Sequence, residues 1–206
     1  MSPRPYRLGQ RQMATEQTRA RILTAARELL LTSDAFSGFS IDAVARQADV
    51  ARMTIYHKFG SKIGLLEALS DSLAAHGGME QLANAFRQPD PLEALDEYTI
   101  VFSRFWQSDR LVTRRLRALS ALDPDFEKVV KARDERRREG LHVIVLRCVE
   151  KYGKPAPEAL DAIVNILFTL LSFETFDTLA GSTRSIEEIS PVVQRLVRAA
   201  LKLDIR

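Results

Sequence analysis

The sequence lacks what several protein classes require. Its one cysteine, Cys148, cannot form an intramolecular disulfide, and no apolar secretory segment opens the chain, so we expect a protein of the reducing cytoplasm. The most apolar stretch, residues 163–173, contains Asn165 and Thr169 and is much shorter than the roughly 20 residues of a membrane-spanning helix. The sequence therefore predicts no membrane segment.

Groups for catalysis and metal binding are also scarce. The histidines His57, His76 and His142 are scattered without the spacing of metal ligands, and the sequence has no glycine-rich phosphate loop or nucleophile elbow. Acidic residues gather around Asp123, where they suit the start of a helix better than a metal site. We therefore expect no enzyme, no metal site and no cofactor.

What the sequence has is a helical pattern and an uneven charge. Hydrophobic residues make up 46% of the 206 residues, and apolar positions recur at helical spacing without an alternating strand pattern. Of the net charge of +3, residues 1–62 carry +5, from ten basic and five acidic residues, and the remainder carries −2. The positive charge therefore lies at one end of an all-α chain.

The segment that begins at Ser40 is typical of a helix-turn-helix. Ser40 is a good N-cap for a short helix, and Asp49 tolerates the left-handed backbone of a sharp turn. A second helix follows over about residues 52–59, with Ile55 and Phe59 facing inward. Polar and basic side chains on its outer face, and a lysine at the next helix start, can bond base edges or phosphates. The residues expected to contact DNA are Ser40, Arg52, Met53, Thr54, Tyr56, His57, Lys58 and Lys62.

These motifs resemble the TetR family of transcriptional regulators. Two positions depart from the family. Asp49 stands where glycine is usual, and Ala51 stands where serine usually caps the recognition helix. Loss of that cap should lower local helix stability by about 1 kcal/mol. Neither departure removes a group that faces DNA. The matching residues, within about the first third of the chain, are 18–31, Phe36, Phe39, Ser40, Val44, Ala45, Ala48, Val50, 54–59, Ser61, Lys62, Leu65 and Leu66.

The resemblance implies a homodimeric regulator of two domains. Residues 16–62 would form a three-helix DNA-binding domain with its helix-turn-helix at about 40–59, and residues 63–206 a larger helical domain for effector binding and dimerisation. The family further implies a repressor that a small-molecule effector releases from a palindromic DNA operator. A helical carrier protein without DNA function, and a helix-turn-helix dimer without an effector, are the alternatives.

Residues 1–15 are predicted to be a flexible basic arm. Arg4, Arg7 and Arg11 lie in a segment that is too rich in proline, glycine and glutamine to favour a helix. The arm either reaches a DNA groove or is a solvated tail, and the charge pattern does not decide between them.

Helix-start and helix-stop signals divide the remainder. Helices are expected to begin at Asp90-Pro91, at Ser108 and at Asp123-Pro124, the last of these closing at Gly153. The final helix starts near Ser190-Pro191, or earlier if Ser185 and Glu188 form a capping box. Between them, residues 156–180 are predicted as one helix that is apolar around most of its circumference.

Two sets of residues in the C-terminal part are candidate sites. Aromatic and polarizable side chains could line an effector chamber, although plain core is the commoner role for such residues. Arg133 and Arg137 share an inward stripe, where they would bind an anionic group of an apolar or amphipathic effector, pair with Asp or Glu on a neighbouring helix, or extend into water. The candidate effector residues are Tyr98, Phe102, Trp106, Arg133, Arg137, His142, Cys148, Phe168 and Phe173.

A helix with two apolar faces also needs a second cover, which another copy of the chain or an internal position in a monomer would supply. The residues expected at a dimer interface are Ile163, Leu167, Leu171, Val193, Leu196, Val197 and Ala200.

Overall fold

A computed structural model describes residues 4–32, 39–153 and 160–201 of the chain, with the side chains described from residue 12 onward. The described residues form helices and no strand, which confirms the all-α prediction. They divide into two compact units, one of Met1–Ser72 with Arg115–Phe126 and one of Leu73–Arg114 with Glu127–Arg206. The first boundary along the chain thus falls after residue 72 and not after residue 62 as predicted, and the first unit also takes in residues 115–126, from the end of one later helix and the start of the next.

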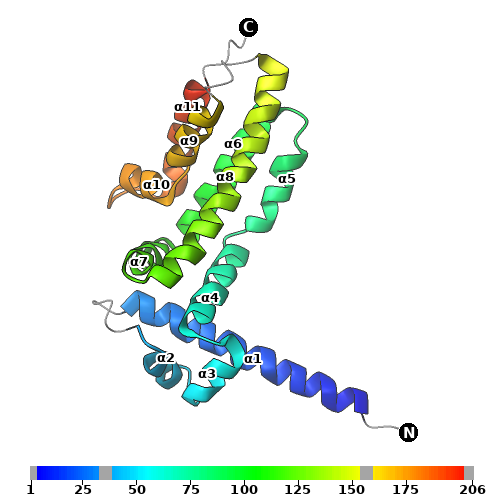
Figure 1. Ribbon diagram of the computed structural model, residues 1–206, viewed down its shortest axis with the longest axis vertical. Coiled ribbons are helices and arrows are strands. Elements are labelled where there is room, and N and C mark those ends of the chain that lie inside the picture. Colours follow the sequence, from blue (N-terminus) through cyan, green and yellow to red (C-terminus); the bar gives the residue numbers. More distant parts are fainter. Residues whose placement is uncertain (1–3, 33–38, 154–159, 202–206) are drawn as a thin grey trace. The chain divides into compact units, whose positions relative to one another are not determined.

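The first unit is built on α1 (Arg4–Thr32), which Figure 1 shows in blue with α2 and α3 on one side of it. Its apolar stripe of Ile22, Ala26 and Leu30 is buried, as residues spaced three or four apart on one helix face should be. The helix begins at Arg4, so residues 4–15 of the segment predicted as a flexible arm are helical. Proline is tolerated in a first helical turn, and Pro5 therefore does not prevent this start.

The other helices of this unit are short. The helix α2 (Ile41–Gln47) and the helix α3 (Arg52–Phe59) match the predicted helix-turn-helix, and α4 (Lys62–His76) follows with Leu65, Leu66 and Leu69 almost fully buried. Of the two phenylalanines that match the TetR family, Phe39 is buried and Phe36 lies outside the described residues.

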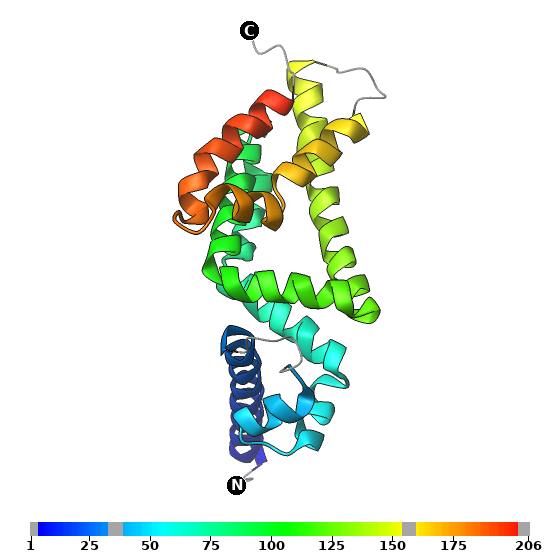
Figure 2. The ribbon, with the colours of Figure 1, turned by 90° about the vertical axis from the view of Figure 1, so that its left-hand side faces the viewer.

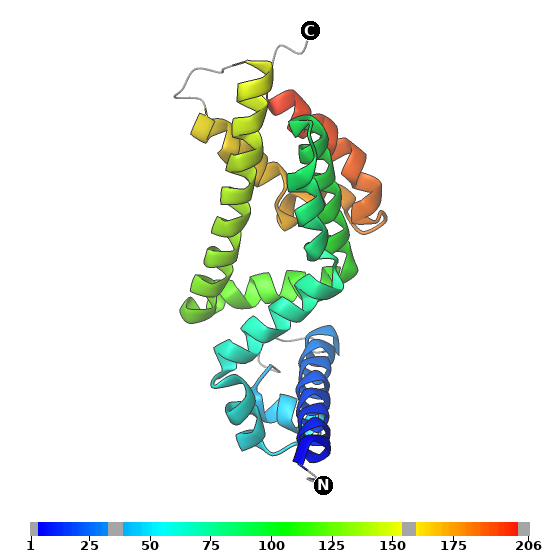
Figure 3. The ribbon, with the colours of Figure 1, turned by 90° about the vertical axis from the view of Figure 1, so that its right-hand side faces the viewer.

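The second unit surrounds a single apolar core. Its central helix α6 is amphipathic and buries Leu95, Tyr98, Phe102 and Trp106. Figures 2 and 3 show α11 running along α6. The remaining bounds are η2 (Met79–Gln81), α5 (Leu82–Arg87), α6 (Pro91–Ser108), α7 (Arg110–Leu122), α8 (Pro124–Tyr152), α9 (Leu160–Leu170), α10 (Phe173–Ala180) and α11 (Ile186–Ala200).

The prediction of one long apolar helix over residues 156–180 is wrong in one respect, because the described part of this segment forms two helices, α9 and α10. The break occurs at Ser172, whose hydroxyl accepts a hydrogen bond from the Thr175 backbone N–H at 3.2 Å and so caps a new helix. The Leu171 carbonyl, left without a helical partner, accepts a bond from the Trp106 indole at 3.3 Å. Apolar spacing continues across the break, so periodicity alone did not reveal it. The predicted start at Ala156 lies outside the described residues.

Two other helix starts differ from the first choice made from sequence. The helix α11 begins at Ile186 with the capping box of Ser185 and Glu188, and Pro191 lies inside it. Asp109 directly precedes α7, and its carbonyl accepts the first helical bond, from Thr113, at 2.9 Å. Ser108, the predicted cap, remains the last residue of α6.

Among the described helices, none alone has the length and apolarity to cross a membrane. The pair α9 and α10 passes that test together by length and composition, with a bend of 47° between its halves.

Candidate functional site

Local chemistry fixes the turn that positions α3. The Ser40 hydroxyl accepts a hydrogen bond from the Ala43 N–H at 3.1 Å, which confirms the predicted N-cap of α2. After α2, Asp49 adopts a φ of 50°, and the Val50 N–H bonds back to the Ala45 carbonyl at 3.0 Å. The left-handed residue predicted in the turn is therefore Asp49 itself. Ala51 precedes α3 without a side-chain cap, as its methyl group requires.

Two side chains set which face of α3 is exposed. Ile55 is completely buried, and the half-buried Phe59 ring lies under the Arg19 guanidinium, 5.0 Å from its carbon to the ring centre. The opposite face is open to solvent, with Met53 58% exposed and His57 also exposed. The predicted contact residues therefore lie on or beside an accessible face of the proposed recognition helix.

An ion pair that the sequence analysis did not predict joins α2 to the start of α3. Arg52 Nη1 lies 3.2 Å from both carboxylate oxygens of Asp42, and Arg52 Nη2 lies 3.2 Å from the Tyr56 hydroxyl. The Arg52 guanidinium carbon is also 5.5 Å from the centre of the Tyr56 ring. Asp42 gave no sequence signal for this role, because an acid in a first helical turn is explained by the helix dipole alone.

The two lysines predicted to contact DNA, Lys58 and Lys62, also have partners inside the first unit. Lys58 Nζ donates to the Thr15 carbonyl of α1 at 3.3 Å, and Lys62 Nζ lies 3.6 Å from an Asp123 carboxylate oxygen. Both lysines are partly exposed, so their ammonium groups can exchange these partners for phosphate oxygens. Ser61 caps α4, since its hydroxyl accepts the Gly64 N–H at 3.0 Å.

An open groove runs between α2 and the start of α3. Two acids and two arginines lie along it, so its charge is mixed. The residues that line the groove are Asp42, Ala45, Arg46, Asp49, Val50, Ala51 and Arg52.

In the second unit, the structure brings most of the candidate effector residues together. The ring centres of Tyr98 and Phe102 are 4.8 Å apart, and Trp106 lies 5.7 Å from both Phe102 and Phe173. Cys148 belongs to the same buried cluster, and burial raises the pKa of its thiol to about 11. His142 and Arg133 are only half-buried. The aromatic residues thus form a continuous packed layer.

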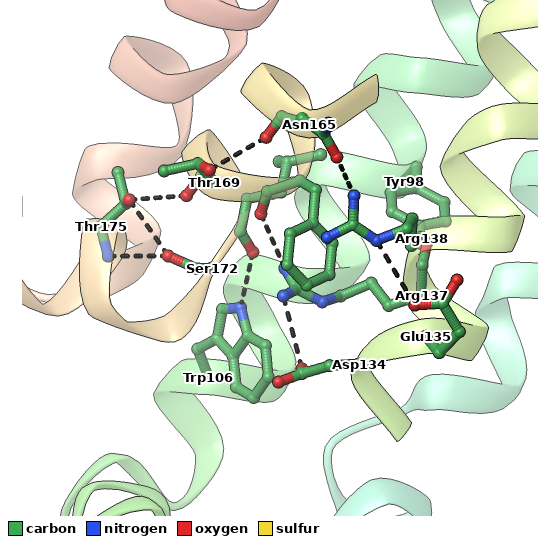
Figure 4. Close-up of polar contacts among 12 residues, drawn as sticks. Tyr98, Trp106, Asp134, Glu135, Arg137, Arg138, Asn165, Thr169, Ser172 and Thr175 are labelled. Carbon is green, nitrogen blue, oxygen red and sulfur yellow. Dashed lines mark hydrogen bonds and ion pairs between the residues drawn. The ribbon is translucent and has the colours of Figure 1, made fainter. Parts of the chain in front are cut away.

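Arg137 is a buried charged group at this layer, as its inward phase predicted. Its guanidinium lies 3.9 Å from the Phe168 ring centre and donates to the Phe168 carbonyl at 3.2 Å (Figure 4). Its Nη2 lies 3.4 Å from Asp134, an acid on its own helix. The Tyr98 hydroxyl donates to the Arg137 carbonyl at 2.9 Å, and burial raises the pKa of Tyr98 above its ordinary value.

Most of the residues predicted at the dimer interface do not lie on the surface of their unit. Five of them are buried in the core of their own unit, so they cannot form a surface between subunits, whereas Leu196 is 42% exposed and Ala200 half-buried. The exposed apolar residues of the same helices are instead Ala162 and Ile166 on α9 and Ala199 on α11. The apolar pattern of residues 156–180 did not show which face of α9 is exposed. The five buried residues are Ile163, Leu167, Leu171, Val193 and Val197.

Comparison with known proteins places this helix-turn-helix. Residues 22–69 match the family model described as bacterial regulatory proteins, tetR family. The chain carries a TetR-family domain. A curated relative, the HTH-type transcriptional regulator AlkX of Mycobacterium tuberculosis, is 45% identical over 53 residues, which are 26% of this chain and 25% of that protein. The match thus spans only a quarter of the length of AlkX.

Solved structures extend the TetR likeness of the fold to most of the chain. The TetR-family regulator PfmR from Thermus thermophilus has a TM-score of 0.65 at 21% identity, over 90% of this chain and all of PfmR. A putative transcriptional regulator from Streptomyces coelicolor A3(2) has a TM-score of 0.59 at 17% identity, over 90% of this chain and 99% of its own. RolR in complex with the ligand resorcinol gives 0.50 at 20% identity, with coverages of 94% and 96%. The TetR-family domain is therefore followed by a larger helical domain of the same overall fold.

Proposed function

We propose that this TetR-family protein is a cytoplasmic transcriptional regulator that binds a palindromic DNA operator as a homodimer and acts as a repressor. The observation that carries the proposal is the face of α3, where Arg52, Met53, Tyr56 and His57 are accessible on a helix fixed by a capped α2 and a left-handed turn. Residues near the start of a recognition helix contact base edges in the major groove, while neighbouring cations hold phosphates. Lys58 and Lys62 are the proposed phosphate contacts.

The homodimer is proposed to form through the exposed sides of α9 and α11. Ile166 is 48% exposed and Leu196 42% exposed, and Ala162 and Ala199 expose further apolar surface on the same two helices. Exposed apolar surface on adjoining helices favours association with another copy. Light scattering at micromolar concentration should give a dimer for the wild type and a monomer for Ile166→Glu with Leu196→Glu. Val143→Glu, at an exposed apolar position of α8, is the matched control and should stay dimeric.

The effector is proposed to bind between α6, α8 and α9, beside the aromatic layer and Arg137. The rings of Tyr98 and Phe102 lie at stacking distance, and the Arg137 guanidinium lies over the Phe168 ring. These groups suit an aromatic or amphipathic molecule with an acidic group. The neighbouring fold of RolR was solved with resorcinol, a small aromatic ligand, which supports this class. An effector shifts DNA affinity only by its different affinities for the two conformations of the dimer.

A regulator without an effector is the second candidate, favoured by the near-complete burial of Tyr98, Phe102 and Trp106 in one core. A thermal-shift screen with aromatic acids, phenols and long-chain acids separates the two. A molecule that binds the folded state raises the melting temperature by mass action, and it should also change DNA affinity if it is an effector.

Fluorescence anisotropy tests DNA binding itself. The probes are a duplex from upstream of the protein's own gene and a scrambled duplex, over a salt series, for wild type and Tyr56→Ala. We expect selective, salt-sensitive binding by the wild type and its loss in Tyr56→Ala. A wild type that binds no DNA even at low salt would contradict the proposal and favour the carrier alternative.

A further inference from the structure

An acid lies where the proposed function needs cations. Asp42, in the first turn of α2, has a side chain that is 61% exposed, and it faces Arg52 at the start of α3, whose side chain is 55% exposed. Both line the open groove between the two helices. A carboxylate on a surface that meets DNA repels phosphates, so its presence calls for a physical account.

The contacts of Arg52 restrict where its guanidinium can point. One nitrogen lies 3.2 Å from both oxygens of Asp42, and a second lies 3.2 Å from the Tyr56 hydroxyl. The guanidinium also lies 5.5 Å from the Tyr56 ring centre. A long, flexible side chain is thereby held from two sides at the N-terminal end of the recognition helix.

Stability does not explain this pair. Ion pairs between side chains as exposed as these contribute little to folding, because water screens their attraction and ordering two side chains opposes it. Asp42 suits the dipole of α2, but its ion pair with Arg52 adds little to folding, so we expect the effect of that pair where Arg52 meets another molecule.

We propose that Asp42 is a positioning residue that sets how well the protein discriminates its operator from other DNA. This inference rests on the DNA-binding function proposed above. Asp42 sets the discrimination by holding Arg52 against Tyr56. Held there, Arg52 offers its remaining N–H groups in one direction, as bidentate bonding to a guanine edge requires. On unrelated DNA, a phosphate must displace the Asp42 carboxylate to reach Arg52. Asp42 thus weakens binding to unrelated DNA more than binding to the operator.

Asp49 provides a matched control in the same groove. Its replacement by Asn removes the same charge, and Asn tolerates the φ of 50° observed there. Within the described residues the Asp49 side chain forms no hydrogen bond or ion pair, and its backbone carbonyl accepts from Arg21 at 3.4 Å. Asp42→Asn and Asp49→Asn therefore differ in the contact with Arg52.

The experiment uses the full chain and two duplexes. One duplex is enriched from a random-sequence pool by the wild-type protein, and the other is its shuffled counterpart. Dissociation constants are measured by anisotropy across a salt series for wild type, Asp42→Asn, Asp49→Asn, Arg52→Ala and the double variant Asp42→Asn/Arg52→Ala. Thermal melting checks folding, and Asp42→Ser replaces Asp42→Asn if the latter does not fold.

We expect Asp42→Asn to bind the shuffled duplex about three- to tenfold more tightly at low salt, with a salt slope steeper by about one, as one gained phosphate contact requires. The ratio of affinities for the two duplexes should fall about tenfold. Asp49→Asn should tighten binding to both duplexes alike and keep the ratio. In the Arg52→Ala background, adding Asp42→Asn should leave the ratio unchanged.

Equal ratios in Asp42→Asn and Asp49→Asn, with a wild type that discriminates, would overturn this inference alone, because Asp42 would then act only through its charge. A wild type that enriches no sequence and binds neither duplex at low salt would overturn the proposed function together with it.

Discussion

Arg52 in the first unit and Arg137 in the second have the same kinds of partner and opposite surroundings. Each lies over an aromatic ring and near an aspartate, with Tyr56 and Asp42 for Arg52 and with Phe168 and Asp134 for Arg137. The Arg52 side chain is 55% exposed and that of Arg137 only 4%. The same set of contacts can therefore orient a side chain for an outside partner or hold a core together.

Desolvation accounts for the difference. A buried guanidinium has lost its water. A substitution of the arginine or of one of its partners therefore leaves a buried polar group without a hydrogen bond. An exposed guanidinium that loses its protein partners is hydrated by water, so the free energy of unfolding changes little. We therefore expect substitutions at the two arginines to affect different properties: folding at Arg137 and DNA recognition at Arg52.

Replacing Arg137 should have the largest effect on folding. Arg137→Ala removes the bond to the Phe168 carbonyl and the ring contact and leaves space in the core, so we expect a loss of about 2–4 kcal/mol in the free energy of unfolding. Urea denaturation followed by circular dichroism measures it. Arg136→Ala, at an exposed neighbouring position, is the control and should change stability by less than about 0.5 kcal/mol. Equal, small losses in both variants would contradict the structural role of Arg137.

A pair of tyrosines should show the same contrast with a smaller effect. Tyr98→Phe removes a buried hydroxyl that donates to the Arg137 carbonyl, and Tyr56→Phe removes an exposed hydroxyl that accepts from Arg52. We expect a loss of about 1–2 kcal/mol for the first and less than about 0.5 kcal/mol for the second, measured by urea denaturation. A larger loss in Tyr56→Phe would reverse the comparison.

An ion pair of intermediate exposure should give a pH-dependent effect between these extremes. Asp177 bonds to Arg110 at 2.6 Å and Arg114 at 2.7 Å. Burial raises the pKa of Asp177, but the bonds from these arginines outweigh it and lower that pKa below 3.8. A carboxylate whose pKa falls on folding stabilises the protein above its unfolded pKa, and this contribution is lost as the pH falls through the folded value.

The free energy of unfolding of Asp177→Asn should therefore be lower than that of wild type by about 1 kcal/mol or less at pH 7, after allowance for solvent screening. The difference from wild type should shrink as the pH falls below about 4. Urea denaturation from pH 7 to pH 3 measures it, with Asp161→Asn on the exposed side of α9 as the control. A difference that stays constant over this range would show that the charge of Asp177 is not what stabilises the pair.

Local signals account for what the sequence predicted well. Ser40, Asp49 and Ser61 act on backbone groups one to three residues away, so their roles as caps and turn could be predicted from the chain itself. The inward position of Arg137 followed from its phase on α8 in the same way. Such signals sufficed for the fold class and the proposed recognition helix.

Contacts between distant residues account for what the sequence did not predict. At the break after α9 the Trp106 indole donates to the Leu171 carbonyl, and Arg52 is held by an acid on another helix. The outer face of α9 could not be assigned, since Ala162 and Ile166 on its exposed side are apolar like its buried side, and tertiary packing decides between the two faces. The role of Asp42 is of the same kind, because its partner lies across the turn.

Replacing Arg52 should have the smallest effect on folding and a large one on DNA binding. Arg52→Ala gives up an ion pair that is exposed on both sides, so the free energy of unfolding should change by less than about 0.5 kcal/mol. Affinity for an enriched duplex should fall about tenfold or more, as loss of one bidentate base contact requires. Denaturation and anisotropy on the same preparations measure both, with Arg46→Ala, an arginine lining the same groove, as the control. A variant that unfolds more easily yet binds DNA like wild type would show that Arg52 resembles Arg137 after all, since its contacts would then serve the fold and not recognition.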